Sequence, residues 1–482
     1  MKLIFASRSH LERKSNDSKF PDSSDSALSA KLRPIIITVA FLMFFVSAAG
    51  VFLTLPLGRS GRVDFRHLYT AGYMVRVGHA ADVYDYSLYE KFQQELVGPA
   101  QGALPFNHLA YEALFYVPFS FLSYQHAYLA FLAANLIVLA GLIRILTPLF
   151  SSLAQIWSLS PVALVVCFLP VSIALIEGQD SLILLALFAA AVGAESAQQD
   201  LKAGILIGLT LFKFQYALPV VLLFLLWRRW RFLAGFVISG VAVFGISVWL
   251  TGLSGLVTYA RSILAMSAKY SPANGLLYGI HLDGMPNLRG LAYMFTGGSI
   301  SATHWIVLIG STVILVWGAL QRPSLPGALL TAMLVSYHQV ISDASLLILP
   351  IGLVLAGHLR DVRTGRSKLS MVLACVAFVS PTVLLFANTR FYLLALPVGA
   401  LFVLWDCAKK PSPKDFDKQG QRQQTDTNLP PCGSAKIESL RPQIKSIIIS
   451  YLEPIWYAPN WRSRCFYYSK AVSPCAARIQ ID

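Results

Sequence analysis

The stretch PIIITVAFLMFFVSAAGVFLTLPL, residues 34–57, contains no charged side chain over 24 residues. As an α-helix that rises about 1.5 Å per residue, it extends about 36 Å, which is enough to cross a bilayer with some tilt. It is too long, and begins too far from the first residue, to be a typical signal peptide. The stretch therefore predicts a membrane-spanning helix.

The composition of the whole chain agrees with this interpretation. The 482 residues are 56% hydrophobic and 13% charged, whereas soluble chains average about 25% charged residues. The net charge of +15 is typical of basic cytoplasmic loops in a membrane protein and does not require nucleic acid as a partner. The six cysteines include no C-x-x-C pair, which argues against a zinc site or a disulfide framework. We expect an all-α, polytopic membrane protein.

Further apolar runs and basic clusters define the expected topology. Because basic loops stay in the cytoplasm, the arginines at 228–231 and the basic segment 360–368 predict cytoplasmic boundaries and two cytoplasmic termini. We expect about ten to twelve spans with helices in the outer loops. After residues 34–57, the expected spans are residues 126–147, 161–176, 181–194, 232–251, 303–321, 327–336, 344–357, 370–387 and 391–405.

Residues 203–226 interrupt this pattern, because Lys213 divides the run into two half-length segments. Side counting favours a re-entrant pair of helices with Lys213 at its tip. The alternative is a single span with Lys213 in mid-bilayer, which costs several kcal/mol unless the charge is paired.

The domain organisation follows from the same composition. Residues 1–33 and 409–482 are polar and predict disordered cytoplasmic tails. Residues 34–408 form the expected membrane domain, with large outer loops at 58–125 and 252–302.

The first outer loop contains GRVDFRHLYTAGYMVRVGHAADVYD, residues 61–85. Asp64 stands just where the chain leaves the membrane, and the helical spacing of Leu68, Tyr69, Gly72 and Tyr73 predicts a short helix on the membrane face. Further on, Ser87 and Glu90 have the spacing of a capping box at the start of another helix. Residues 108–123 are expected to form a half-buried outer helix.

Polar residues interrupt the apolar part of the chain at several points that this topology places toward the outer face. Ionisable groups at helix ends that converge on one membrane face predict a functional site. These groups are Asp64, Glu177 with Gln179 and Asp180, Lys213 with Gln215, Arg289, and His338 with Asp343.

Several tracts, in order over roughly residues 60–405, resemble glycosyltransferase family 87, polyprenyl-phosphate-mannose-dependent enzymes of the GT-C type. One departure is Phe214, where the family often has proline. The matching tracts are Asp64-Phe65, Tyr69, Ala71-Gly72, Gly78 and Tyr84-Asp85 in the loop, then Gly178-Gln179, Ala203-Gly204, Leu211–Gln215, Asn287–Gly290, Ser336–His338 with Asp343, and Leu349-Pro350.

The resemblance implies that a hexose, mannose in this family, moves from a polyprenyl-phosphate-linked donor to a lipid or glycan acceptor hydroxyl. The resemblance also implies that transfer takes place on the extracytoplasmic face of the plasma (inner) membrane, as part of cell-envelope synthesis, and that a single displacement inverts the anomeric carbon. Asp64 is the expected catalytic base, since the attacking hydroxyl needs a proton acceptor within reach. No metal and no cofactor is expected. Lys213, Arg289 and His338 are candidates for the donor phosphate, and Tyr69, Gln179, Gln215 and Asp343 for substrate binding.

Each residue also has a purely structural interpretation. Asp64 and Asp343 can cap helices, residues 177–179 can be only a tight turn, and His338 can be a packing histidine. Lys213 can extend to the outer head groups, and Arg289 can anchor its loop to lipid phosphate. At the level of function, the alternatives are a transporter or lipid flippase, whose permeation path the outer charges would line, and a non-catalytic scaffold.

Overall fold

The computed structural model describes residues 23–98, 104–268, 282–360, 365–382, 397, 399 and 400, all within one unit that extends over Met1–Lys410. Every regular element in these ranges is a helix, and they contain no strand. The all-α membrane fold is therefore confirmed. The predicted tail 409–482, residues 1–22 of the first tail and most of the predicted span 391–405 lie outside the described residues.

Four of the described helices are long and apolar enough to cross a membrane: α1 (Ser23–Arg59), α5 (Tyr124–Leu149), α11 (Trp230–Ala268) and α14 (Ile300–Ala319). Two bent pairs raise this number to six if each pair is one span. They are α6 (Ser160–Val166) with α7 (Leu169–Glu177), and α9 (Asp200–Gly208) with α10 (Phe214–Leu226). Only 6% of the most apolar 18-residue stretch of α1 is buried within the protein. Its large side chains therefore face outward, as lipid contact requires.

Shorter apolar helices lie inside this shell. Every residue of α15 (Leu325–Val335) from Leu325 to Leu334 is buried, and α8 (Ser181–Ser196) is buried along most of its length. A helix that is apolar on all sides needs such surroundings. The same core contains residues of η7 (Ile341–Leu347), α16 (Ile348–Arg360) and α17 (Gly365–Val379).

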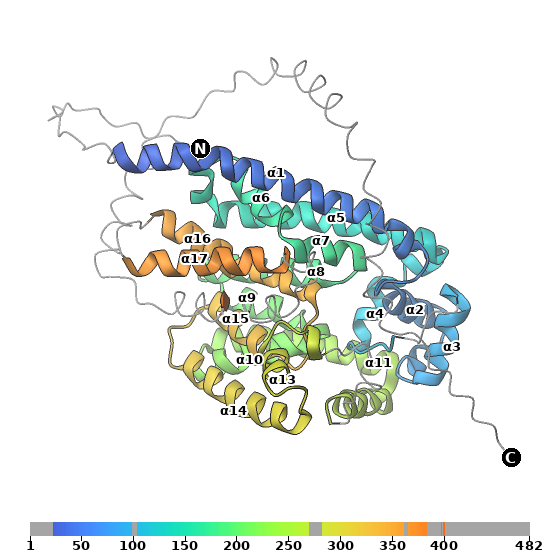
Figure 1. Ribbon diagram of the computed structural model, residues 1–482. Coiled ribbons are helices and arrows are strands. Elements are labelled where there is room, and N and C mark those ends of the chain that lie inside the picture. Colours follow the sequence, from blue (N-terminus) through green and yellow to red (C-terminus); the bar gives the residue numbers. More distant parts are fainter. Residues whose placement is uncertain are drawn as a thin grey trace, which may run out of the picture. The chain divides into compact units, whose positions relative to one another are not determined.

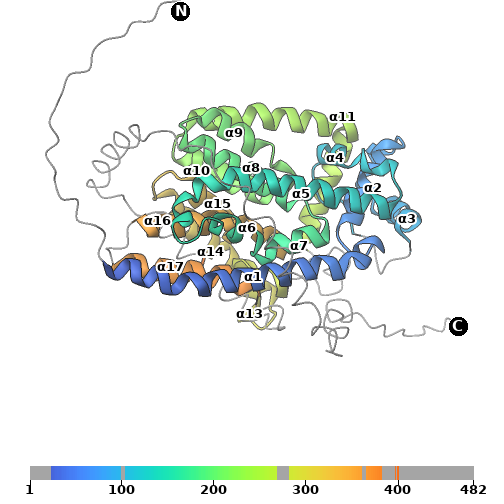
Figure 2. The same cartoon turned by 90° about the horizontal axis from the view of Figure 1, so that it is seen from above.

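Residues 58–125, the predicted first outer loop, fold into a small helical layer with its own core. It contains α2 (Phe65–Arg76), η1 (Ala80–Asp82), α3 (Tyr86–Val97), η2 (Ala110–Glu112), α4 (Ala113–Tyr116) and η3 (Phe119–Phe121). Figure 1 and Figure 2 both show α2, α3 and α4 gathered at one end of the helical unit. Aromatic rings hold this layer to α5, since Phe65 stacks on Phe131 with ring centroids 4.9 Å apart. Gly72 allows close packing, because a Cβ there would lie 2.5 Å from the Tyr116 backbone.

The helices have two polar levels, one at each end of α8. At its last turn, a Glu195 carboxylate oxygen accepts a hydrogen bond from the Leu325 N–H at 3.0 Å, and Arg229 pairs nearby with Asp200 at 2.7 Å. At its first turn lie Asp180 and Ser181, which belong to the site described below. The 16 residues of α8 separate the two levels by about 24 Å.

The Asp200–Arg229 pair also bears on the predicted re-entrant segment. Asp200 begins α9, and Arg229 lies three residues after the end of α10. The ion pair shows that α9 begins, and the chain after α10 returns, at the same polar level. Lys213 lies at the break between these two helices. This contact agrees with the re-entrant arrangement and disfavours a single span through Lys213.

Several predicted boundaries were wrong. The helix α1 begins at Ser23, within the tail that we expected to be disordered to residue 33. Residues 108–123 form three short pieces rather than one helix. The cap of α3 is Asp85, whose carboxylate accepts from the N–H groups of Ser87 and Leu88, so the capping box at Ser87 and Glu90 is not formed. Short polar segments allow several caps, and packing selects among them.

The second outer loop, predicted over residues 252–302, also contains more helix than expected. The helix α11 continues to Ala268 past Gly252, whose φ of 69° marks a kink, and α13 (Leu288–Phe295) follows residues 269–281, which lie outside the described ranges. We did not predict these helices because we searched for apolar runs long enough to span a membrane. These segments are too polar for a span, although they are amphipathic enough to form a helix.

Candidate active site

A cavity lies where α2 begins, beside the turn between α7 and α8 and the break between α9 and α10. Its volume is about 70 Å³, several times the 10–15 Å³ or so that one water molecule needs. Six of the eight predicted site residues line it: Asp64, Gln179, Lys213, Gln215, His338 and Asp343. The fold therefore brings together residues from four separate segments of the chain.

Asp64 stands at the N-cap position of α2, but its side chain makes no capping hydrogen bond. Its carboxylate instead accepts a hydrogen bond of 2.5 Å from the side-chain amide of Gln179, 115 residues away. Burial raises the pKa of Asp64, while the Gln179 hydrogen bond opposes that shift. The capping interpretation therefore fails, and Asp64 is a buried carboxylate that faces the cavity.

The turn that carries Gln179 is tight because Gly178 adopts a left-handed conformation, with φ of 61°, at the end of α7. A Cβ at Gly178 would lie 2.7 Å from Phe65, so glycine also allows the turn to approach the start of α2. Glu177 accepts a hydrogen bond from the Asp64 N–H at 3.3 Å. Residues 177–179 thus form a turn that also makes two hydrogen bonds with Asp64, one to its backbone N–H and one to its carboxylate.

Lys213 is buried and paired with two carboxylates. Its ammonium lies 2.6 Å from Asp180 and 2.5 Å from Asp343. Asp343 further accepts hydrogen bonds from Ser181 at 2.7 Å and Tyr216 at 2.9 Å. Asp343 lies within η7 and is not its cap, and the 3% exposure of Lys213 excludes an extension to head groups.

His338 and Gln215 complete the predicted wall. His338 is half-buried, and its buried Nδ1 has no hydrogen-bond partner in the described part of the chain. Burial lowers the pKa of His338 to about 4, so the ring is neutral at pH 7. Gln215 lies in the first turn of α10, two residues after Lys213.

Tyr69 and Arg289, the other two predicted residues, do not line the cavity. The Tyr69 hydroxyl donates to the Leu122 carbonyl at 2.8 Å, which ties α2 to the end of η3. Arg289 is buried and donates to the Tyr337 carbonyl at 2.6 Å, so it supports the segment that carries His338 and does not reach out to lipid.

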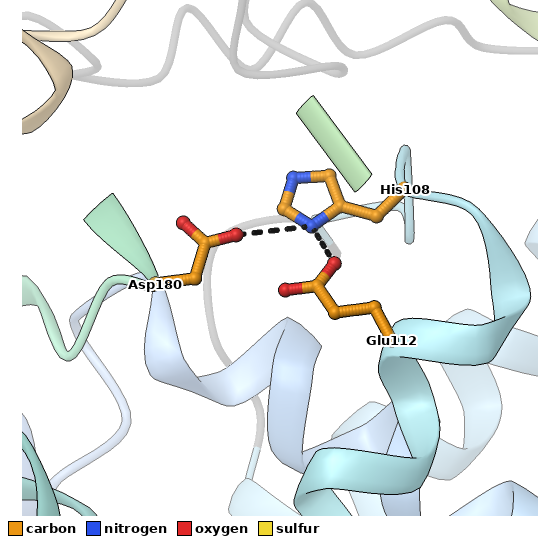
Figure 3. Close-up of side chains that lie close together, drawn as sticks. All are labelled: His108, Glu112 and Asp180. Atoms are coloured by element: carbon orange, nitrogen blue, oxygen red, sulfur yellow. Dashed lines mark hydrogen bonds and ion pairs between the residues drawn. The ribbon is translucent and has the colours of Figure 1, made fainter. Parts of the chain in front are cut away.

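His108, Glu112 and Asp180 form a buried cluster beside the cavity (Figure 3). The sequence placed Asp180 among the outer polar groups but did not single out His108 or Glu112, and of the three His108 lines the cavity. His108 Nδ1 hydrogen-bonds the Glu112 carboxylate and lies 3.5 Å from Asp180. Burial raises the pKa of Glu112 to about 7, and burial likewise raises that of Asp180, but Lys213 and His108 lower the Asp180 pKa to about 2. The i, i+4 spacing of His108 and Glu112 was the available signal.

Among the described residues, these three side chains form the one group whose ligand atoms are close enough together to hold a metal ion, since those atoms lie within 4.8 Å of one another. However, His108 and Glu112 are in direct hydrogen-bond contact, whereas two ligands of one ion about 2.1 Å away stand about 3 Å or more apart. The Asp180 carboxylate also forms an ion pair with Lys213. In this structure the three side chains are connected as an ion-pair network.

His67 was also missed. It lines the cavity, its ring lies edge-on to His108 with centroids 5.7 Å apart, and neither ring nitrogen has a partner among the described residues. Burial lowers the pKa of His67 to about 3, so it is neutral. Buried polar atoms usually have partners, so His67 marks a part of the cavity wall open to a ligand.

Residues 111–350 match the family model described as glycosyltransferase family 87. This segment belongs to glycosyltransferase family 87. Together with the apolar helices, the match shows a multi-pass membrane glycosyltransferase and confirms the resemblance found in the sequence. Comparisons with curated proteins and with solved structures found no match.

The family 87 segment includes just over half of the residues that line the cavity, from Gln179 through Lys213 to Asp343. Asp64 lies 47 residues before its start, outside the matched range. The position of Asp64 in the site therefore rests on its contact with Gln179, which belongs to the family 87 segment.

Proposed function

We propose that this family 87 glycosyltransferase transfers mannose from a polyprenyl-phosphate-linked donor to a hydroxyl of a lipid or glycan acceptor. The reaction takes place on the extracytoplasmic face of the plasma (inner) membrane, with both termini in the cytoplasm. Sugar-nucleotide donors are confined to the cytoplasm, so a lipid-phosphate carrier is the donor that this face offers. The observation that carries the proposal is the cavity in which Asp64 faces Gln179, Lys213 and His338.

Asp64 supplies the base. Its burial raises its pKa, which makes the carboxylate a stronger proton acceptor than an exposed one. The acceptor hydroxyl loses its proton to Asp64 as its oxygen attacks the anomeric carbon. The bond between that carbon and the phosphate oxygen breaks, and the lipid phosphate leaves with the electron pair. One displacement inverts the configuration.

The leaving phosphate needs positive charge or hydrogen-bond donors near its oxygens. Lys213, oriented by Asp180 and Asp343, and His338 are the predicted residues that lie in the wall for this task. Arg289 contributes by holding the Tyr337 carbonyl. Gln215 and Gln179 remain candidates to contact the sugar, while Tyr69 has a packing role.

Purified protein is incubated with polyprenyl-phosphate-mannose and candidate lipid acceptors, with GDP-mannose as the comparison donor. We expect sugar transfer from the lipid donor only. Transfer from GDP-mannose alone would contradict the proposed donor class.

The variant Asp64→Asn tests the base in the same assay. We expect transfer to fall by about 10²- to 10⁴-fold, because the amide has nearly the same shape but no basicity. Donor binding is retained. Asp82→Asn, which removes a half-exposed carboxylate that does not line the cavity, is the control and keeps full activity. Full transfer by folded Asp64→Asn protein would remove Asp64 from the reaction.

A further inference from the structure

His108 is a histidine held firmly from one side. Its Nδ1 hydrogen-bonds one Glu112 oxygen, and the other Glu112 oxygen accepts a hydrogen bond of 3.1 Å from the Tyr116 hydroxyl. Asp180 lies 3.5 Å from the same Nδ1. Because Glu112 is fixed by Tyr116, the orientation of the His108 ring is fixed in turn.

The other nitrogen, Nε2, is on the side of the ring away from the Glu112 carboxylate (Figure 3). His108 lines the cavity, and no described residue hydrogen-bonds its Nε2. A ring whose Nδ1–H is given to a carboxylate presents Nε2 to whatever occupies the cavity. His108 therefore offers one free polar atom to a ligand.

The charges around His108 favour the protonated ring. Burial lowers the pKa of His108, but Glu112 and Asp180 outweigh burial, and the net effect raises it. Lys213 acts in the opposite direction, and the remaining titratable rings nearby, His67 and His338, are neutral. A protonated ring carries a hydrogen on Nε2 and donates it.

Asp180 places this donor beside Lys213. One Asp180 oxygen contacts the Lys213 ammonium at 2.6 Å, and the other lies 3.5 Å from His108. Two cationic side chains of the cavity wall thus share one buried carboxylate. Phosphate oxygens, which accept several hydrogen bonds from charged donors, suit such a wall.

We propose that His108 binds the phosphate of the lipid-linked donor through Nε2–H. Glu112 is the positioning residue, since it orients the ring and accepts the hydrogen bond from Nδ1–H, which stabilises the protonated form. This inference rests on the proposed function and adds a phosphate-binding residue that the sequence did not indicate. Glu112 does not itself touch the substrate.

The test measures binding of farnesyl phosphate, a short polyprenyl phosphate, to the full-length protein in detergent by microscale thermophoresis. Farnesol, which has the same chain without phosphate, is measured in parallel. In wild-type protein the phosphate strengthens binding. In His108→Gln we expect affinity for farnesyl phosphate to fall about ten-fold or more, with farnesol unchanged, because a charge-assisted hydrogen bond is lost.

Glu112→Gln separates positioning from simple structural damage. Without the Glu112 charge, the pKa of His108 falls. Affinity for farnesyl phosphate is measured between about pH 5.5 and 8.5, and we expect the midpoint of the loss of affinity with rising pH to lie at lower pH than in wild-type protein. A purely structural role would weaken binding equally at all pH values. The matched control is Asp82→Asn, in a half-exposed His79–Asp82 pair outside the cavity wall, and it leaves the midpoint unchanged.

The outcomes are distinguishable. If wild-type protein binds farnesyl phosphate no better than farnesol, the proposed donor class fails, and this inference fails with it. If wild-type protein prefers the phosphate but folded His108→Gln binds it equally well, or Glu112→Gln keeps the wild-type midpoint, only this inference fails. If EDTA abolishes phosphate binding and Mn²⁺ restores it, a metal ion holds the phosphate, and the inference is overturned.

Discussion

At the residue scale, the ionisable groups of the cavity are organised by pairing. Asp64 is bound by an amide, Lys213 by two aspartates and His108 by a glutamate. Each partner decides what its residue is able to do, because a buried charge without a partner is costly. From the sequence alone we expected Lys213 to be available to the donor phosphate, whereas it is shared with Asp180 and Asp343.

Gln179→Ala tests the hydrogen bond that tunes Asp64. That hydrogen bond lowers the Asp64 pKa against the effect of burial, so its removal raises the pKa further. The base acts only when it is ionised. The acid limb of the rate profile therefore moves to higher pH, and activity is lost first at low pH. The measurement is transfer rate against pH, and Gln94→Ala, which removes an exposed glutamine, is the control. An acid limb at the wild-type pH would show that this hydrogen bond does not tune the base.

Lys213→Met tests the buried ion pairs. The change leaves Asp180 and Asp343 buried without their shared cation, so we expect a loss of about 3–5 kcal/mol of stability. Unfolding in detergent is followed by circular dichroism. The exposed Lys202 provides the control Lys202→Met, which has little effect. Adding Asp343→Asn to Lys213→Met recovers part of the loss, and a stable single variant would contradict this assignment.

At the element scale, close helix contacts support the re-entrant pair. The helices α9 and α11 run in the same direction, since Leu201 meets Gly235 and Gly208 meets Ser239. A Cβ at Gly204 would lie 1.9 Å from the Phe232 carbonyl oxygen. Glycines thus let α9 lie directly against α11, as small residues do between membrane helices. Because α10 packs on α11 and α15, this contact helps to place Lys213 beside the cavity.

Gly204→Val should separate α9 from α11 and lower the apparent melting temperature, because overpacking costs about 1–3 kcal/mol or more. Transfer activity falls as well, since Lys213 follows α9 in the chain. Gly141→Val is the matched control, because a side chain at Gly141 in α5 meets open space. Equal melting temperatures for the two variants would mean that α9 does not depend on this contact.

At the scale of the whole molecule, two polar levels lie at opposite ends of the core helices. One contains the cavity, and the other contains the Asp200–Arg229 pair and the hydrogen bond of Glu195 with the start of α15. With a membrane between them, the positive-inside rule predicts that the arginine-rich level is cytoplasmic. In this predicted topology the cavity opens toward the outside, where the proposed donor is presented.

Cysteine labelling tests this sidedness. In a cysteine-free background, Ser60→Cys places a thiol at the exposed end of α1, and Ala197→Cys places one at the exposed turn after α8. In intact cells, a membrane-impermeant maleimide should label position 60, and it should label position 197 only after permeabilisation. The reverse pattern would place the cavity in the cytoplasm and contradict the lipid-linked donor.

The sequence by itself determined the fold class, the residues that form most helices and six residues of the cavity wall. Span length, hydrophobicity and the charge at helix ends are local properties, so they are readable in a short window. Only the tertiary structure decided the partners: Gln179 for Asp64, Asp343 for Lys213, and the His108 cluster. Those contacts join segments up to 130 residues apart in the chain. No local pattern records them, because the packing of whole helices against one another sets which buried charges meet.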